Sequence, residues 1–151
     1  MDINAQAPAV ARTEVEIRAD IETVWRVLTN LQDWPRWKSD VSSLSLRGPL
    51  VPGSTFVWKA GRATISSTLR EVEEPKSIGW TGTTMGIRAI DVFTLLSLDE
   101  HTTRVTEEES WEGTLVRLLR SRLQRTLQTS IEHGLRALKT EVERQAAIQA
   151  A

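Results

Sequence analysis

The chain has 151 residues, of which 40% are hydrophobic and 26% are charged, a size and composition typical of one folded domain. Its formal net charge of -1 argues against a nucleic-acid-binding protein, which usually presents a strongly basic face. The lack of cysteine excludes disulfides, thiolate catalysis and cysteine-based metal sites. The N-terminal MDINAQAPAVART carries no signal-peptide pattern, and no apolar run approaches the ~20 residues of a membrane span. We therefore expect a cytoplasmic protein.

The first third of the chain predicts one strand and two short helices. Residues 1–11 are rich in alanine and show no periodicity, so we expect a flexible N-terminus. From residue 12 polar and apolar residues alternate up to Ile17, which predicts a half-buried strand. Asp20 can cap a helix that ends near Asn30, and the segment DWPRWKSD (33–40) predicts a second, shorter helix.

The remainder predicts a run of strands followed by one long helix. Short polar turns separate the strands, which favours an antiparallel sheet. The expected strands are Val41–Arg47, Thr55–Lys59, Ala63–Glu73, Ile78–Thr84, Ile87–Leu98 and Thr103–Trp111. After Gly113 the apolar spacing becomes helical, in a stripe that runs from Leu115 to Val142. Gly134 interrupts this stripe, either to let the sheet or a ligand approach or without any structural cause. Residues 146–151 are expected to fray, which leaves one domain over residues 12–145.

Several segments resemble, in order and spacing, the START-like superfamily, also called Bet v 1-like or SRPBCC, and above all its polyketide cyclase/dehydrase-like branch. They are EVEIRADIETVWRVLTN (14–30), DWPRWKSDV (33–41), PGSTFVWKAG (52–61), STLREVEEPKSIGWTG (67–82), TTRVTEEESWEGTL (102–115) and the final helix. The resemblance implies an α+β helix-grip fold, in which a curved antiparallel seven-stranded sheet wraps around the long C-terminal helix, with two short helices between strands 1 and 2. It also implies an apolar cavity between sheet and helix that binds hydrophobic small molecules and, in a minority of members, performs chemistry.

Strand alternation predicts which side chains face this cavity, because every second residue lies on the same face of a strand. The predicted ligand-binding residues are Phe56, Trp58, Ile65, Ser67, Trp80, Thr84, Asp91, Phe93, Glu107, Glu109 and Trp111 on strands, and Leu115, Leu119, Leu127 and Ile131 on the helix. Apolar walls with a few converging polar groups are typical of a ligand pocket. In the alternative interpretation these aromatic residues fill a solid core. Trp34 and Trp37 are similarly open to two interpretations, as cavity wall or as a structural plug.

The stretch EEESWEG (107–113) carries the most informative polar residues. Alternation turns Glu107 and Glu109 inward with Trp111 and leaves Glu108 on the outer face. A buried, unpaired carboxylate is destabilising, so it is either neutralised by a raised pKa or matched by a cation. Asp91 and Glu109 are the candidate general acids or bases. The alternative is that Glu107 and Glu109 lie near the open end of the strand and pair with water or with arginines at the start of the long helix, namely Arg117, Arg120, Arg122 or Arg125.

Other chemistries find little support in the sequence. His101 and His133 are far apart, so we expect no metal site, and no cofactor motif or nucleophile elbow is present. The favoured function is binding of an apolar small molecule, such as a lipid, polyketide or aromatic metabolite. The alternative is a polyketide cyclase/dehydrase-like enzyme that uses a cavity carboxylate. We expect no cofactor, no nucleic-acid partner and no integral membrane contact, and the sequence leaves a homodimer open.

Overall fold

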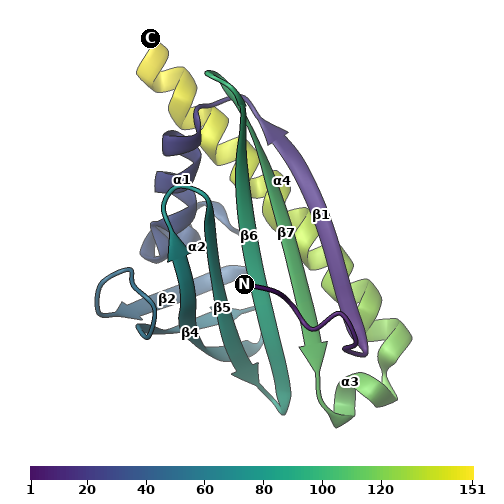
Figure 1. Ribbon diagram of the computed structural model, residues 1–151. Coiled ribbons are helices and arrows are strands. Elements are labelled where there is room, and N and C mark those ends of the chain that lie inside the picture. Colours follow the sequence, from purple (N-terminus) through teal and green to yellow (C-terminus); the bar gives the residue numbers. More distant parts are fainter.

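One curved antiparallel sheet and one long helix dominate the molecule (Figure 1). The computed structural model describes residues 1–151, and the sheet order is β1-β7-β6-β5-β4-β3-β2. The strands are β1 (Ala9–Ile17), β2 (Val41–Arg47), β3 (Thr55–Ala60), β4 (Ala63–Glu73), β5 (Ser77–Thr84), β6 (Ile87–Asp99) and β7 (Thr102–Glu112). The helix α4 (Arg120–Ala150) lies against the concave face of the sheet. This is the predicted helix-grip fold.

Three short helical segments connect β1 to β2 and close one end of the sheet. They are α1 (Ile21–Thr29), the 3-10 turn η1 (Leu31–Asp33) and α2 (Trp34–Trp37). The side chain of Asp20 caps α1 by accepting a hydrogen bond from the backbone N–H of Thr23 at 3.1 Å, as the sequence predicted. Trp34 is 1% exposed, and its indole N–H donates to the carbonyl of Leu28 at 2.9 Å. Trp34 is therefore a structural plug.

The N-terminal segment is more ordered than its sequence suggested. β1 already begins at Ala9, and both Ala9 and Ala11 are buried. The residues before β1 cross the outer face of the sheet (Figure 1), where the backbone N–H of Asn4 donates to the hydroxyl of Ser110 at 3.1 Å. The N-terminal ammonium of Met1 contacts Glu71 at 2.6 Å. Small buried side chains and isolated polar contacts hold this segment, so it shows no hydrophobic periodicity. At the other terminus α4 continues past residue 145 to Ala150.

The predicted long helix is broken near its start. A short helix, α3 (Thr114–Leu118), precedes α4, and Leu119 between them has φ -111° and ψ 32°, outside the helical region. The break removes Leu115 and Leu119 from the apolar stripe, and each is 41% exposed. The prediction of one continuous helix from Leu115 was therefore wrong, because regular apolar spacing across a short break does not reveal a change of direction.

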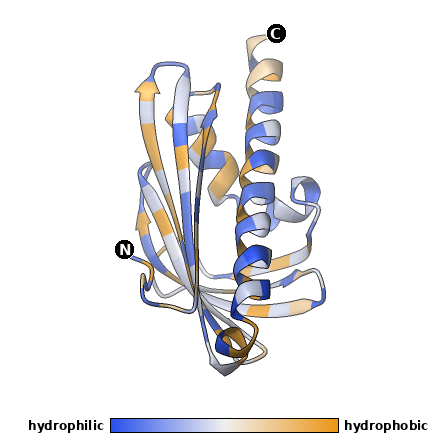
Figure 2. Ribbon diagram, turned by 90° about the vertical axis from the view of Figure 1, so that its right-hand side faces the viewer, coloured by the Kyte–Doolittle hydropathy of each residue, from blue (hydrophilic) through white to orange (hydrophobic).

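Two apolar clusters fill the space between the sheet and the helices. The larger cluster includes Trp34, Phe56, Trp80 and Phe93, and it joins the middle of the sheet to α1 and to the C-terminal half of α4. The smaller cluster lies towards the other end and consists of Ala9, Ala11, Ile87, Val116, Leu127 and Ile131. Sheet and α4 form two separate layers in the side view (Figure 2). None of the helices combines the length and the hydropathy needed to cross a lipid bilayer.

Candidate functional site

A cavity of about 420 Å³ lies between the sheet and α4 and borders both apolar clusters. This volume falls within the range of small-molecule sites, roughly 300–1,000 Å³. Gly61, Met85, Thr126 and Ser130 line the cavity and are also exposed on the molecular surface. The mouth therefore lies between the β3–β4 turn, the β5–β6 turn and the first turns of α4.

Most of the predicted lining residues do border this cavity. They are Trp58, Ile65, Ser67, Trp80, Thr84, Asp91, Glu107, Glu109, Trp111 and Ile131. The alternation rule succeeded on the strands because the register carries no bulge between β5, β6 and β7 over this region. That these residues bind a ligand stays a prediction.

The other predicted lining residues lie elsewhere. Phe56 and Phe93 point inward as expected, yet they are packed into the larger cluster. Leu127 belongs to the smaller cluster. Leu115 and Leu119 lie on or next to α3 and face solvent. These corrections share one cause: alternation and helical spacing give the face of an element, whereas the depth at which packing stops and a cavity starts depends on side chains from distant parts of the chain.

Aromatic rings form the floor of the cavity. Trp80 packs edge-on against Trp34 at 5.7 Å and Phe56 at 5.5 Å between ring centroids. Trp58 meets Trp34 at 6.0 Å in a perpendicular arrangement, and its indole N–H donates to Ser67 Oγ at 3.0 Å. Such edge-to-face pairs fix ring orientation beyond simple area burial. The floor is therefore a rigid apolar surface, and the indole N–H of Trp58 already has a hydrogen-bond partner within the protein.

Three carboxyl groups converge on one wall of the cavity. Asp91 on β6 and Glu109 on β7 are directly opposite each other in the strand register, and Glu107 lies two residues along the same face of β7. One oxygen from each of the three lies within 4.8 Å of the others. Like charges this close on paired strands repel each other. The group can therefore persist in an apolar cavity only if protons or a cation reduce its charge.

Burial is the main cause that keeps protons on this carboxyl cluster, which we define as Asp91, Glu107 and Glu109. Asp91 is 6% exposed and Glu107 is 3% exposed. Desolvation, reinforced by the charge of Glu107, raises the pKa of Asp91 well above its usual range. Desolvation likewise raises the pKa of Glu107 to about 8. The charge of Glu109 adds to this rise at Glu107, because close carboxyl groups resist ionising together.

Glu109 has a different environment from its two neighbours. It is only half-buried because it borders the cavity itself, and its Oε1 accepts a hydrogen bond from the indole N–H of Trp111 at 2.8 Å. Desolvation and the charge of Asp91 raise its pKa, while the bond from Trp111 opposes the rise. By contrast, Asp91 Oδ1 is buried and has no hydrogen-bond partner. This oxygen is under-satisfied, since buried polar atoms rarely remain unpaired.

Lys38 is a cavity residue that the sequence did not single out. Its ammonium lies 4.6 Å from the ring centroid of Trp34 and 5.8 Å from that of Trp58, and it lowers the pKa of all three carboxyl groups. Gly134 on α4 makes room for it, because a Cβ there would come within 3.3 Å of Lys38 Cε and Nζ. The neighbour of Gly134 is therefore this lysine, and not the sheet or a ligand as one of the two interpretations held. A lysine directly after a Trp-Pro-x-Trp segment gives no signal that it will reach the cavity.

The arginine interpretation of the glutamates is wrong. Arg117, Arg120, Arg122 and Arg125 are all exposed, and none is among the causes that act on the pKa of Glu107 or Glu109. Lys38 is the cation that acts on the carboxyl cluster.

The histidines take no part in this site. His133 lies 3.2 Å from Ser39 Oγ, and His101 is exposed on the β6–β7 turn. If an ion bound the carboxyl cluster, its all-oxygen ligands would suit a hard divalent cation rather than a metal that prefers imidazole.

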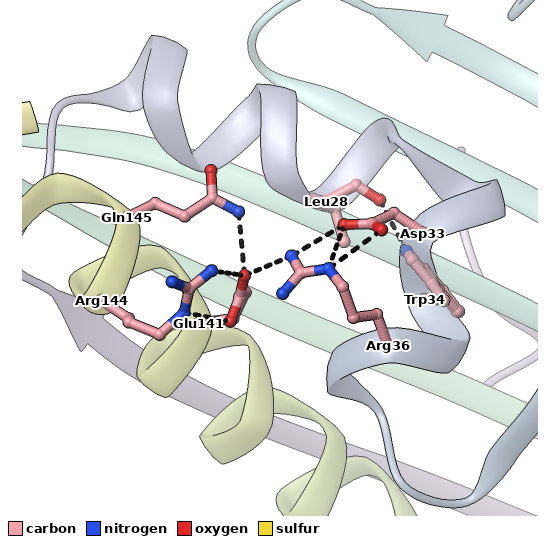
Figure 3. A network of polar contacts seen from close by, with 7 residues as sticks. All are labelled: Leu28, Asp33, Trp34, Arg36, Glu141, Arg144 and Gln145. Atoms are coloured by element: carbon pink, nitrogen blue, oxygen red, sulfur yellow. Dashed lines mark hydrogen bonds and ion pairs between the residues drawn. The ribbon is translucent and has the colours of Figure 1, made fainter. Parts of the chain in front are cut away.

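A second buried carboxylate, Glu141 on α4, does not line the cavity. Figure 3 shows it between the side chains of Arg36, Arg144 and Gln145. It is 6% exposed and accepts hydrogen bonds from Arg144 at 2.7 Å, from Gln145 at 2.9 Å and from Arg36 on α2. Its pKa falls to about 2, above all because of the bond from Arg144. This network joins α2 to α4 and is structural. Sequence patterns give no signal of the contact between α2 and α4, because Arg36 and Glu141 are 105 residues apart.

Comparisons with known proteins agree with this architecture. The family described as polyketide cyclase / dehydrase and lipid transport matches residues 8–143. The chain belongs to this family. No curated protein matches the sequence.

Solved structures share the fold of this polyketide cyclase-like chain at low sequence identity. The hypothetical protein jhp0584 from Helicobacter pylori superposes with a TM-score of 0.83 at 14% identity, over 93% of this chain and 91% of that one. The Zhui aromatase/cyclase from Streptomyces sp. R1128 gives 0.80 at 14% identity, over 91% and 94%. A START superfamily protein from Mycobacterium smegmatis gives 0.72 at 17% identity, over 90% and 98%. At these identities the likeness shows the START-like fold.

Proposed function

We propose that this protein binds an apolar small molecule that carries an oxygen function, such as a carbonyl or hydroxyl group, at one end. The single observation behind the proposal is the cavity of about 420 Å³, which is lined by aromatic residues and by the three carboxyl groups of the cluster. The family match supports a hydrophobic ligand. Lipids, polyketides and aromatic metabolites all fit this description.

The two parts of the cavity have separate roles in this proposal. Affinity comes from apolar ligand surface that leaves water, at about 25 cal/mol per Å². Orientation comes from Asp91, which lines the cavity and whose Oδ1 has no hydrogen-bond partner. A protonated carboxyl group donates a hydrogen bond to a ligand carbonyl, and an ionised one accepts a bond from a ligand hydroxyl. Thr84 and Ser67 supply further polar contacts.

A matched ligand pair tests this directly, with the protein's six tryptophans as the probe. Fluorenone and fluorene share one ring system and differ by the carbonyl. Both should change the tryptophan emission, and fluorenone should bind about fivefold more tightly, the usual worth of one hydrogen bond. Asp91→Asn keeps a donor and should retain the preference, whereas Asp91→Leu should abolish it. If fluorenone, fluorene and a long-chain fatty acid all leave the emission unchanged, the proposal fails.

An acid/base enzyme is the second candidate. The observation that favours it is the convergence of Asp91, Glu107 and Glu109, whose oxygens lie within 4.8 Å of one another, since a protonated group beside an ionised one can both give and take a proton. Suitable reactions are enolisation, aldol closure and dehydration of a carbonyl compound. In that case Asp91→Asn would bind ligand and lose turnover. Turnover that survives both Asp91→Asn and Glu109→Gln would contradict this assignment.

A further inference from the structure

The end of the molecule that holds the cavity mouth carries arginines without ion-pair partners. Arg88, Arg117 and Arg120 line a concave surface site of about 580 Å³ between the β5–β6 turn, the end of β7 and α3. The acidic residue in this site, Glu112, accepts a hydrogen bond from Asn4 at 2.5 Å. None of the three arginines forms an ion pair, in contrast to Arg36, Arg104 and Arg144 elsewhere.

More unpaired arginines surround the same mouth. Arg62 is exposed next to Gly61, which lines the cavity, and Arg122 and Arg125 are exposed on the first turns of α4. The formal net charge of the chain is only -1, so this end is strongly positive within a nearly neutral protein. A one-sided positive region attracts an anionic surface and orients the protein towards it.

Large apolar side chains project from this positive end. Leu118 on α3 is 76% exposed and Met85 on the β5–β6 turn is 70% exposed, beside the partly exposed Leu115 and Leu119. Figure 2 shows α3 at the end of the molecule away from the C-terminus, with hydrophobic and hydrophilic residues side by side. Leucines and arginines that lie together at one end of a molecule suit the boundary between lipid headgroups and acyl chains.

Met85 adds an independent observation. Its φ is +47° and that of Gly86 is +76°, a two-residue hairpin turn in which asparagine or glycine normally occupies the first position. A long apolar side chain with positive φ is unfavourable for the backbone. Here it is also exposed, so neither packing nor turn geometry explains it. A contact between the Met85 side chain and a partner outside the protein would explain it.

We infer that the cavity-mouth end, defined by Met85, Leu118, Arg88, Arg117 and Arg120, docks on an anionic lipid bilayer. The arginines hold lipid phosphates, and the two apolar side chains enter the upper acyl region. The protein lies on the bilayer and does not cross it. The mouth then opens towards the lipid phase, so an apolar ligand could enter without crossing water. The docking itself does not depend on which ligand the cavity holds.

Vesicle co-sedimentation tests the inference. Vesicles of phosphatidylcholine with phosphatidylglycerol should bind the protein, and pure phosphatidylcholine vesicles should bind it weakly. Added salt should weaken binding, because exposed charges are screened. Arg117→Gln and Arg120→Gln should each lower the affinity about fivefold, while Arg47→Gln, an exposed arginine at the far end of β2, should have no effect. Equal binding to both vesicle types would overturn the inference.

Apolar variants separate docking from folding. Leu118→Ser should reduce vesicle binding about tenfold, whereas Leu96→Ser, which is 54% exposed near the opposite end, should leave it intact. Met85→Asn should raise the melting temperature by relieving the turn and still weaken vesicle binding. If vesicle affinity rises and falls with the melting temperature across these variants, the surface is not a bilayer-docking site. The same holds if free glycerol phosphate displaces the protein completely from vesicles. Binding to a soluble polyanion in preference to vesicles would likewise point to an acidic protein partner and overturn the inference.

Discussion

Two buried carboxylate sites in this protein have opposite electrostatics. Glu141 is surrounded by donors from Arg36, Arg144 and Gln145, and its pKa is lowered to about 2. The carboxyl cluster of Asp91, Glu107 and Glu109 has no arginine, and desolvation raises the pKa of each member. The fold thus supplies two arginines to Glu141, whereas the carboxyl cluster has only the charge of Lys38 to oppose its desolvation.

The difference separates a structural site from a candidate ligand site. A satisfied carboxylate such as Glu141 has little left to offer a ligand. An under-satisfied group stores unfavourable desolvation that a ligand can relieve, which is why perturbed titratable groups concentrate at functional sites. Asp91, which lines the cavity and whose Oδ1 has no hydrogen-bond partner, is the sharpest example here.

The largest expected effect concerns Glu107 and pH. Between pH 4.5 and about 8 the folded state holds a proton on Glu107 that the unfolded state has lost, so stability falls as pH rises through this window. Glu107→Gln removes this dependence. At pH 9 the variant should be more stable than the parent by up to about 5 kcal/mol, at about 1.4 kcal/mol per pKa unit, and by less where water enters the cavity. Urea unfolding at pH 5, 7 and 9 measures the free energy of unfolding of both proteins. If this free energy changes with pH in the same way in the parent and in Glu107→Gln, the account is contradicted.

A smaller effect of opposite sign is expected at Glu141. Its pKa is depressed to about 2, so it stabilises the fold above pH 4.5 and loses this contribution as pH falls towards 2. Glu141→Gln should destabilise the protein by about 1–2 kcal/mol at pH 7, less than a fully buried pair because both arginines are half-exposed.

Glu14→Gln serves as the control for this change, since the Arg12–Glu14 pair is exposed and should contribute nothing measurable. Thermal or urea unfolding of both variants at pH 7 and pH 3 gives the comparison. A Glu141→Gln protein as stable as the parent at pH 7 would remove the contrast between the two sites.

The smallest effect tests Lys38 as the cation that moderates the carboxyl cluster. Its charge lowers the pKa of all three members, so Lys38→Met should raise the pKa of Glu107 by about one unit. Lys59→Met, on the exposed face of the neighbouring strand β3, is the matched control and should leave it unchanged. Carboxyl ¹³C chemical shifts followed against pH report both. An unchanged pKa in Lys38→Met would mean that another group moderates the cluster.

Sequence patterns predicted the fold and the strand side of the site. Alternation placed Glu107, Glu109 and Trp111 inward, because β7 runs through EEESWE without a bulge, and the structure confirms it. Patterns could not predict that Leu119 would break the helix, since the apolar spacing continues across it. They also missed Lys38 and Glu141, whose partners Trp58 and Arg36 come from remote segments. Local periodicity shows which face of a strand or helix is buried, whereas tertiary packing decides which buried faces enclose a cavity.

The pKa of Glu107, set beside that of Glu141, tests the central contrast most directly. A ¹³C-NMR titration of side-chain carboxyl groups, assigned with Glu107→Gln and Glu141→Gln, resolves both. The account predicts that Glu107 titrates near pH 8 and Glu141 near pH 2. If both residues titrate together near pH 4.5, the cavity wall is solvated in the same way as the protein surface, and the account of a buried, under-satisfied carboxyl cluster is wrong.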